Sequence, residues 1–391
     1  MKKVAAILLV FIVFWPCVFA FANEIKEPDV EAQGAILMDA YSGRILWEKD
    51  AHKPLAMAST TKIMTAILAL EQGKLDDIVT VSKRAQNAPK VKMYLSKGEE
   101  ISLSGLLHAL MMQSSNDAAV AIAEHISGSV EEFCAQMTAK AHEIGAVNTF
   151  FATPNGLDAE NHQSTAYDMA LITQYALRNT MFLEIINTEY KEVTSSRTTY
   201  SITNRNRLLH EFEGANGVKT GYTGKAGYCF VGAAKRDGMQ LISVVFASGW
   251  GAKGKEQKWI DTKRILNYGF DNFSNELIVE GGTQAGITEI TRSRTQNMEL
   301  YYGDSVIFPV KDDDEINVVP FFPASITAPI GANYQVGEGR IYIGEDYFTA
   351  TPILTSAAAE RHDLKTSLEK VLREFFRLGT DRDIEIVLPE F

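Results

Sequence analysis

The sequence of 391 residues is poor in cysteine and carries no excess of positive charge. Three cysteines are too few for a disulfide-rich scaffold. With 38 lysine and arginine residues against 49 acidic ones, the net charge of −11 excludes sequence-independent nucleic-acid binding, which needs a basic surface. A mean hydropathy of −0.07 excludes a polytopic membrane protein. Ordinary shares of hydrophobic and charged residues, 46% and 22%, exclude a disordered chain.

A long apolar run does occupy the N-terminus. Two lysines precede the apolar residues 4–21, and Ala20-Phe21-Ala22 ends the run with small residues. This order of basic, apolar and small residues is typical of a secretory signal peptide that is cleaved after Ala22. We therefore expect residues 1–22 to be a signal peptide and the mature protein to be exported. An uncleaved membrane anchor is the alternative.

Two cysteines remain beyond this segment. Cys134 lies in a helical pattern and Cys229 in an apolar strand pattern. Both contexts suit a small buried hydrophobic side chain. We therefore expect two buried thiols rather than the disulfide that an oxidising compartment would allow.

Apolar residues recur at spacings that predict strands at both ends of a first domain and helices between them. A β-hairpin is expected at residues 34–47, and a second hairpin is expected from strands at 228–234 and 240–247. Predicted helices cover residues 60–72, two segments of 101–127 that are separated at 113–116, and residues 130–144, 168–177 and 257–270. Since early and late strands then share one antiparallel sheet with helices on its faces, the fold class is α+β.

The length suggests more than one domain, and the pattern changes after about residue 273. Residues 274–360 are rich in Gly, Thr, Ile, Val and Tyr between turn residues, which predicts a smaller all-β domain. A terminal amphipathic helix is expected from about 363 to 378, within a tail of residues 361–391. The catalytic domain would then span residues 23–273.

The terminal helix has two interpretations. Its apolar stripe is flanked by Lys365, Lys370, Arg373 and Arg377. A basic amphipathic helix of this kind can lie on a membrane surface. The alternative is that the helix docks onto the protein's own β domain, and the sequence favours membrane contact only slightly.

Three short motifs carry residues with chemistry. The first, Ser59-Thr60-Thr61-Lys62, opens a strongly apolar helix, where a polar pair needs a reason. Residues at i and i+3 share a helix face, so Lys62 can reach the Ser59 hydroxyl. A desolvated lysine has a lowered pKa and can act as the base that a serine nucleophile requires. Residues 367–370 also match Ser-x-x-Lys, but on an amphipathic surface helix.

The second motif is Ser114-Ser115-Asn116, in the break between two predicted helices. It can present side chains from a loop, and Ser115 or Asn116 can also cap the following helix. The third is Lys219-Thr220-Gly221, followed by Tyr222. It is either a simple turn into the next strand or a strand edge that offers an ammonium and hydroxyls to a carboxylate.

Together and in this order, the three motifs resemble the serine penicillin-binding and β-lactamase superfamily. The likeness is closer to one branch, the low-molecular-mass D-alanyl-D-alanine carboxypeptidases, and covers about residues 30–272. The resemblance implies a penicillin-binding transpeptidase-like fold. Further stretches that are similar to this branch are 39–44, 116–124, 154–157, 164–168 and 204–209.

The resemblance implies catalytic roles for Ser59, Lys62, Ser114 and Asn116. Ser59 would attack the carbonyl between the last two D-alanines of a peptidoglycan stem peptide, and Lys62 would accept its proton. Backbone N–H groups of Ser59 and Tyr222 would form the oxyanion hole. Ser114 would relay a proton to the leaving amine. No metal or cofactor would be needed.

Asn116, the fourth catalytic residue that the resemblance implies, would hold the substrate amide and orient Lys62. Substrate-binding roles are implied for the residues of the third motif. Lys219, Thr220 and Gly221 would bind the terminal carboxylate, together with the backbone at Tyr222. The resemblance further implies that β-lactam antibiotics acylate the serine and that the protein works in the cell envelope, in cell-wall biogenesis.

Other functions stay open at the level of sequence. A DD-endopeptidase cuts the same kind of bond. A class A-like β-lactamase would need a Glu-x-x-Leu-Asn-type segment, and Glu160 lacks that context. A non-catalytic wall-binding protein would need none of the motif groups. A Ser-His-Asp enzyme is disfavoured because the seven histidines are scattered, and His162 is expected to be a surface or loop residue near the cleft.

Overall fold

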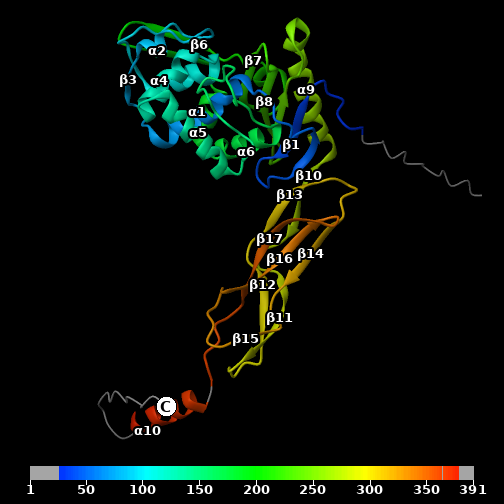
Figure 1. Cartoon of the computed structure of the whole chain (residues 1–391). Helices are drawn as coiled ribbons and strands as arrows, with labels where there is room; N and C mark the ends of the chain where they lie inside the picture. Colours follow the sequence, from blue (N-terminus) through cyan, green and yellow to red (C-terminus); the bar gives the residue numbers. More distant parts are fainter. Residues whose placement is uncertain (1–25, 363, 378–391) are drawn as a thin grey trace, which may run out of the picture.

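The computed structural model describes residues 26–362 and 364–377 (Figure 1). The expected signal peptide, residues 1–22, lies outside the described residues. Among those described, no helix is both long and apolar enough to cross a membrane.

A five-stranded antiparallel sheet, in the order β2-β1-β9-β8-β7, lies at the centre of the first part of the chain. The expected hairpins at residues 34–47 and 228–247 are confirmed, and the first is joined directly to the second because β1 pairs with β9. The sheet strands are β1 (Gly34–Asp39), β2 (Ile45–Lys49), β7 (Ala215–Thr223), β8 (Gly227–Arg236) and β9 (Met239–Phe246).

Helices cover both faces of this sheet, since alternate residues of a strand point to opposite faces. Ile36 and Met38 of β1 pack into a large core with most of the helices, whereas Leu37 packs with Trp259 and Leu266 of α9. In Figure 1, α9 accordingly lies on one side of β1 and β8, and α1, α4, α5 and α6 lie on the other. The α+β class with an antiparallel sheet flanked by helices is thus confirmed.

The helices on the larger face begin with η1 (Ala58–Thr61), which runs directly into α1 (Lys62–Gln72). The expected break at residues 113–116 is present, as the end of the π-helical segment η2 before α4. The remaining helices are α2 (Lys83–Gln86), α3 (Leu103–His108), η2 (Ala109–Gln113), α4 (Asn116–Ser127), α5 (Val130–Ile144), α6 (Ala166–Ala176), α7 (Thr180–Asn187), α8 (Leu208–Glu211) and α9 (Gly251–Asn272).

Two small two-stranded sheets lie at the edge of this helical layer, and the sequence did not predict them. Strand β3 (Ile78–Thr80) pairs with β4 (Glu100–Ser102), and β5 (Tyr190–Thr194) pairs with β6 (Thr199–Thr203).

Both expected thiols are free and buried, and burial raises the pKa of Cys134 and of Cys229 to about 12.

The later part of the chain is all-β, as expected, and forms an elongated body below the first part in Figure 1. A six-stranded sheet has the order β14-β16-β17-β12-β11-β15, and β10 pairs with β13. The strands of this later part of the chain are β10 (Ser274–Val279), β11 (Gln284–Thr291), β12 (Asn297–Tyr302), β13 (Val306–Val310), β14 (Ile316–Phe321), β15 (Ser325–Thr327), β16 (Gln335–Ile343) and β17 (Asp346–Thr355). The domain limits at 273/274 and 360/361 stay predictions.

Arg44 joins the two parts of the chain. Its guanidinium forms a buried ion pair with Asp314 at 2.7 Å and donates to the carbonyl oxygen of Pro309. It also lies over the rings of Phe273 and Phe308, at 5.6 and 5.7 Å from their centroids. This contact anchors the β1–β2 hairpin to strand β13 and to the loop between β13 and β14.

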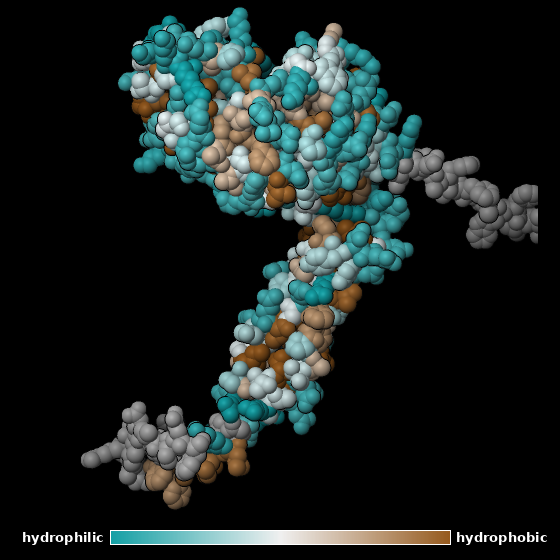
Figure 2. All heavy atoms as spheres, in the orientation of Figure 1, coloured by the Kyte–Doolittle hydropathy of each residue, from teal (hydrophilic) through white to brown (hydrophobic). Residues whose placement is uncertain are grey.

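The terminal helix is α10 (Leu364–Arg377), which lies at the far end of the molecule in Figure 1. Its apolar side chains are exposed, and Figure 2 shows them as brown atoms at the surface. The exposed residues are Leu364, Leu368, Val371, Phe375 and Phe376. The second Ser-x-x-Lys, residues 367–370, lies on this helix, far from the first motif.

Candidate active site

Ser59 and Lys62 meet where η1 turns into α1. Lys62 Nζ lies 3.0 Å from Ser59 Oγ and donates to Asn116 Oδ1 at 2.8 Å. It also donates to the carbonyl oxygen of Asn155. The lysine side chain is fully buried, so its ammonium is held by these partners at the base of the helix. The structure therefore places the serine of the first motif beside its expected base.

The electrostatic surroundings favour the neutral form of Lys62. Burial lowers the pKa of this lysine well below its usual value, and the positive charge of Lys219 lowers it further. The carboxylate of Asp117 opposes this shift, but it is the smallest of the three influences. A lysine with a lowered pKa can accept the proton of a serine hydroxyl near neutral pH.

Strand β7 brings the third motif against Ser59. A Cβ built on Gly221 would lie 2.9 Å from the backbone nitrogen of Ser59 and 3.1 Å from the Cβ of Ala58. Only glycine fits this approach without displacement, which explains why the motif needs that residue. The backbone at Gly221 and Tyr222 thus runs directly beside the nucleophile.

Lys219 is also buried and donates to the carbonyl oxygen of Thr220 at 2.8 Å. Burial lowers its pKa to about 7, and the positive charge of Arg205 contributes to the shift. The next residue after the motif glycine, Tyr222, is half exposed and stacks on Tyr228 with ring centroids 4.3 Å apart. A cluster of cations at a strand edge favours an anionic ligand.

The second motif lies at the junction of η2 and α4. Ser114 ends η2 in the left-handed backbone region (φ 67°, ψ 35°), and Ser115 is the N-cap residue of α4. The Ser115 side chain makes no capping hydrogen bond, so the cap that this side chain could have supplied is not formed. Asn116 Nδ2 donates to the carbonyl oxygens of Pro89 and Lys90 at 3.1 and 3.2 Å.

A loop that the sequence did not mark as catalytic completes the site. The Asn155 carbonyl accepts from Lys62 and, at 3.3 Å, from Ser59 Oγ. Gly156 follows with φ +84°, and a Cβ there would lie 2.0 Å from the carbonyl oxygen of Ala58. The family-like stretch 154–157 was the available signal for this loop. Arg205 was missed in the same way, although it lies in the family-like stretch 204–209.

His162 is a loop residue, as expected, but it does not lie at the surface, because only 4% of the residue is exposed. Its Nδ1 accepts from the backbone N–H of Ala152 at 3.0 Å, so Nε2 carries the proton and donates to Thr61 Oγ1 at 2.8 Å. Burial lowers the pKa of His162 to about 4. The imidazole is therefore neutral and ties the loop of Asn155 to the helix that carries the nucleophile.

Comparisons with known proteins agree with this geometry. A family model described as D-alanyl-D-alanine carboxypeptidase matches residues 21–249. The chain is 30% identical over 390 residues to the D-alanyl-D-alanine carboxypeptidase DacF of Bacillus subtilis, covering 96% of this chain and 99% of that protein. It is 33% identical to the D-alanyl-D-alanine carboxypeptidase DacC of Escherichia coli, covering 79% and 84% of the two chains.

A solved structure shows the same likeness in three dimensions. Penicillin binding protein 5 from Haemophilus influenzae matches with a TM-score of 0.74 and 28% identity, over 86% of this chain and 99% of that one. The resemblance inferred from three motifs is thus confirmed over almost the whole chain. This chain belongs to the D-alanyl-D-alanine carboxypeptidase family of serine-type peptidases.

Proposed function

We propose that this serine D-alanyl-D-alanine carboxypeptidase removes the terminal D-alanine of peptidoglycan stem peptides through an acyl-enzyme on Ser59. The observation that carries this proposal is the 3.0 Å contact between Ser59 Oγ and Lys62 Nζ. A fully buried lysine next to a second cation, Lys219, has the lowered pKa that general-base catalysis requires.

During acylation one proton moves from Ser59 through Lys62 and Ser114 to the leaving amine. Neutral Lys62 takes the proton of Ser59 Oγ as that oxygen attacks the carbonyl carbon of the scissile bond. The negative charge that develops on the carbonyl oxygen is met by the backbone N–H groups of Ser59 and Tyr222. Ser114 passes the proton to the departing D-alanine amine, and the C–N bond breaks. Water then gives a proton to Lys62 as its oxygen attacks the ester, and Lys62 returns that proton to Ser59 Oγ as the bond between Oγ and the acyl carbon breaks, which releases the shortened peptide.

Binding orients the substrate for this attack. The terminal carboxylate of the peptide meets the Lys219 ammonium, the Thr220 hydroxyl and the backbone at Gly221. The Asn116 side chain both accepts from Lys62 and lies where it can meet the substrate amide. A β-lactam carries a carboxylate and a strained amide in a similar arrangement, so it acylates the same serine.

Two related activities are less well supported. Glu160 is exposed, so it is a poor candidate for the deacylating base of a class A-like β-lactamase. Nitrocefin should therefore give one stoichiometric burst rather than sustained turnover. An endopeptidase on cross-linked peptides would use the same groups, and comparison of monomeric and cross-linked substrates separates it from the carboxypeptidase. A non-catalytic wall-binding role would not require a buried lysine with a lowered pKa beside Ser59.

The location follows from two further features. We propose that residues 1–22 direct export and that the enzyme works in the cell envelope. The exposed apolar side chains of α10, together with Lys365, Lys370 and Arg373, support contact with an anionic membrane surface. The helix would then hold the catalytic part near the membrane at the end of the β-rich part.

Release of D-alanine from a stem pentapeptide tests the reaction. The wild-type protein should release one equivalent of D-alanine per peptide, and Ser59→Ala should release none above background. Ser367→Ala is the matched control, because Ser367 belongs to the other Ser-x-x-Lys and should retain full activity. Unfolding curves show that the variants are folded. Release that survives Ser59→Ala would contradict the proposal.

A further inference from the structure

The segment of residues 78–98 is basic, although the protein as a whole carries a negative net charge. Between Asp77 and Glu99 the sequence contains five lysine or arginine residues and no acidic one, although the net charge of the protein is −11. A local cationic region on an acidic protein attracts anions to that place. The position of this region decides which anion it can meet.

Residues 89–95 are fixed against the catalytic motif. Asn116, whose Oδ1 accepts from Lys62, donates its backbone N–H to the carbonyl oxygen of Val91 and its side-chain amide to those of Pro89 and Lys90. The Asp117 carboxylate accepts from the backbone N–H groups of Met93 and Leu95, both at 3.1 Å. Hydrogen bonds therefore hold one end of this segment, residues 89–91, against Asn116, and the rest of the segment leads away from Asn116.

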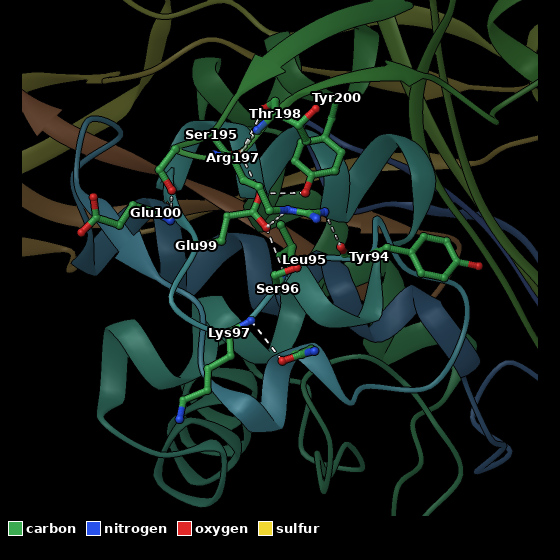
Figure 3. Close-up of polar contacts among 12 residues, drawn as sticks. Tyr94, Leu95, Ser96, Lys97, Glu99, Glu100, Ser195, Arg197, Thr198 and Tyr200 are labelled. Atoms are coloured by element: carbon green, nitrogen blue, oxygen red, sulfur yellow. Dashed lines mark hydrogen bonds and ion pairs between the residues drawn. The ribbon is translucent and has the colours of Figure 1, made fainter.

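Glu99 fastens the tip of the β5–β6 hairpin to the outer end of this segment (Figure 3). Its side chain is completely buried and accepts from Ser195 Oγ at 2.6 Å, Tyr200 OH at 2.7 Å and Arg197 Nε at 3.3 Å. Burial raises the pKa of Glu99, but the hydrogen bonds from Ser195 and Tyr200 outweigh it and keep the group charged. A charged, buried carboxylate thus fixes the position of Arg197.

On the side of this arrangement where Tyr94 lies, cationic and aromatic side chains are exposed, whereas the exposed acid Glu100 lies on the opposite side in Figure 3. About half of the Arg197 side chain is exposed, and its Nη2 lies 3.5 Å from the carbonyl oxygen of Tyr94. Tyr94 is itself 57% exposed, and Lys92 Nζ lies 5.6 Å from the centroid of its ring. In Figure 3 the Tyr94 ring points away from the Glu99 cluster. We call Lys90, Lys92, Tyr94 and Arg197 the cationic rim.

We propose that the cationic rim is a binding subsite for a carboxylate that the substrate carries upstream of its terminal D-alanyl-D-alanine. This inference rests on the proposed function, which places the scissile bond at Ser59 and the substrate amide at Asn116. A peptide that extends beyond Asn116 passes residues 89–94, since that segment is bonded to the same side chain. Stem peptides carry a free carboxylate on their second, γ-linked D-glutamate residue. Glu99 acts here as a positioning residue for Arg197.

Two peptides that differ in one group test the subsite. They are L-Ala-γ-D-Glu-L-Lys-D-Ala-D-Ala and the same pentapeptide with D-isoglutamine, whose amide replaces the only upstream carboxylate. The ratio of their kcat/KM values cancels any general loss of activity. The wild-type protein should prefer the glutamate peptide about twofold to fivefold, as expected for exposed charge pairs. Addition of 0.5 M NaCl should reduce the preference, because salt screens exposed charges.

The variants assign this preference to the rim. Lys92→Gln combined with Arg197→Gln should bring the ratio close to one, and Glu99→Gln should lower it by releasing Arg197. Lys97→Gln is the matched control, because Figure 3 shows Lys97 pointing away from Tyr94 and Arg197; it should keep the wild-type ratio. Penicillin labelling of each variant shows that its fold and Ser59 chemistry persist.

The outcomes separate this inference from the proposed function. A wild-type ratio near one would overturn the subsite while D-alanine release left the proposed function standing. A preference that survives in the double variant would equally overturn the assignment to Lys92 and Arg197. Absence of D-alanine release from both peptides would instead contradict the proposed function.

Discussion

Gly221 passes so close to Ser59 that a Cβ on the glycine would lie 2.9 Å from the serine's backbone nitrogen. This contact places the edge of β7 beside the nucleophile and, with it, the backbone N–H of Tyr222. The two elements are far apart in the sequence, so the proposed oxyanion hole would depend on this close approach of two backbones.

Gly221→Ala should therefore slow acylation of Ser59 by penicillin at least about tenfold, since complete removal of an oxyanion-hole donor costs about a hundredfold to a thousandfold. The added methyl group forces β7 away from the helix start and misplaces its N–H group. Stopped-flow or gel-based labelling measures the rate. Gly224→Ala is the matched control, because a Cβ there has no neighbour within 4 Å. Equal rates for the two variants would show that the contact does not matter.

The pH dependence of kcat/KM for a D-alanyl-D-alanine peptide should be bell-shaped. On the acid side the rate rises as Lys62, whose pKa is lowered by burial and by Lys219, loses its proton and becomes a base. On the alkaline side the rate falls above about pH 7, as Lys219 loses the charge that binds the carboxylate. Arg205 lowers the pKa of Lys219, so Arg205→Gln should move the alkaline limb to higher pH.

Arg207→Gln serves as the control for this shift. Arg207 is an exposed neighbour that pairs with Glu211 and Glu256 and does not act on Lys219. Its profile should overlay that of the wild-type protein. An alkaline limb that stays in place in Arg205→Gln would refute the assignment of that limb to Lys219.

Acid should destabilise the protein through His162. The pKa of this histidine falls from 6.5 to about 4 on folding, so the unfolded chain binds a proton over that range while the folded protein does not. The free energy of unfolding therefore decreases as the pH falls from 6.5 to 4. At about 1.4 kcal/mol for each pKa unit, this contribution is of the order of 3 kcal/mol.

Urea denaturation at pH 7 and pH 4 measures this loss. His162→Gln removes the titrating group, so the stability difference between the two pH values should shrink by about that amount. His210→Gln, at a histidine whose side chain is 57% exposed, should leave the difference unchanged. If the three proteins lose equal stability, another group is responsible.

Membrane contact through α10 should depend on its exposed apolar side chains. Phe375→Glu combined with Leu368→Glu should reduce sedimentation with anionic vesicles severalfold, because the helix loses apolar area and gains negative charge. Vesicles of neutral lipid should bind the wild-type protein more weakly. Chains that end after Ala359 should not sediment at all. Association that persists in the truncated chain would exclude the helix as the anchor.

Much of the fold was accessible from local patterns. The hairpin at β1–β2, helix α5 and the break before Asn116 follow from apolar periodicity and turn residues, and they were predicted close to their observed bounds. Strand β7 was predicted only as one of two interpretations of residues 219–221, a strand edge or a turn, because its residues show little alternation, and the structure shows the strand. The contact of Arg44 with the β-rich part could not be predicted from the sequence either, because its partner Asp314 lies 270 residues further along the chain.

The candidate site was predictable where residues lie within one motif. Ser59 and Lys62 share a helix turn, so their contact follows from spacing alone. Asn155 contributes only a backbone carbonyl, and any residue type can do so, which is why sequence reasoning missed it. His162 was misjudged because a loop histidine is usually exposed, and only its partners Thr61 and Ala152 show why this one is buried.

The most direct test of the account is to find where penicillin attaches. The protein is incubated with benzylpenicillin, its intact mass is measured and the adduct is located by peptide mapping. One adduct per chain, on the peptide that contains Ser59 and absent in a folded Ser59→Ala variant, is the predicted result. An adduct on another residue, or none on the folded wild-type protein, would contradict the assignment of Ser59 as the nucleophile.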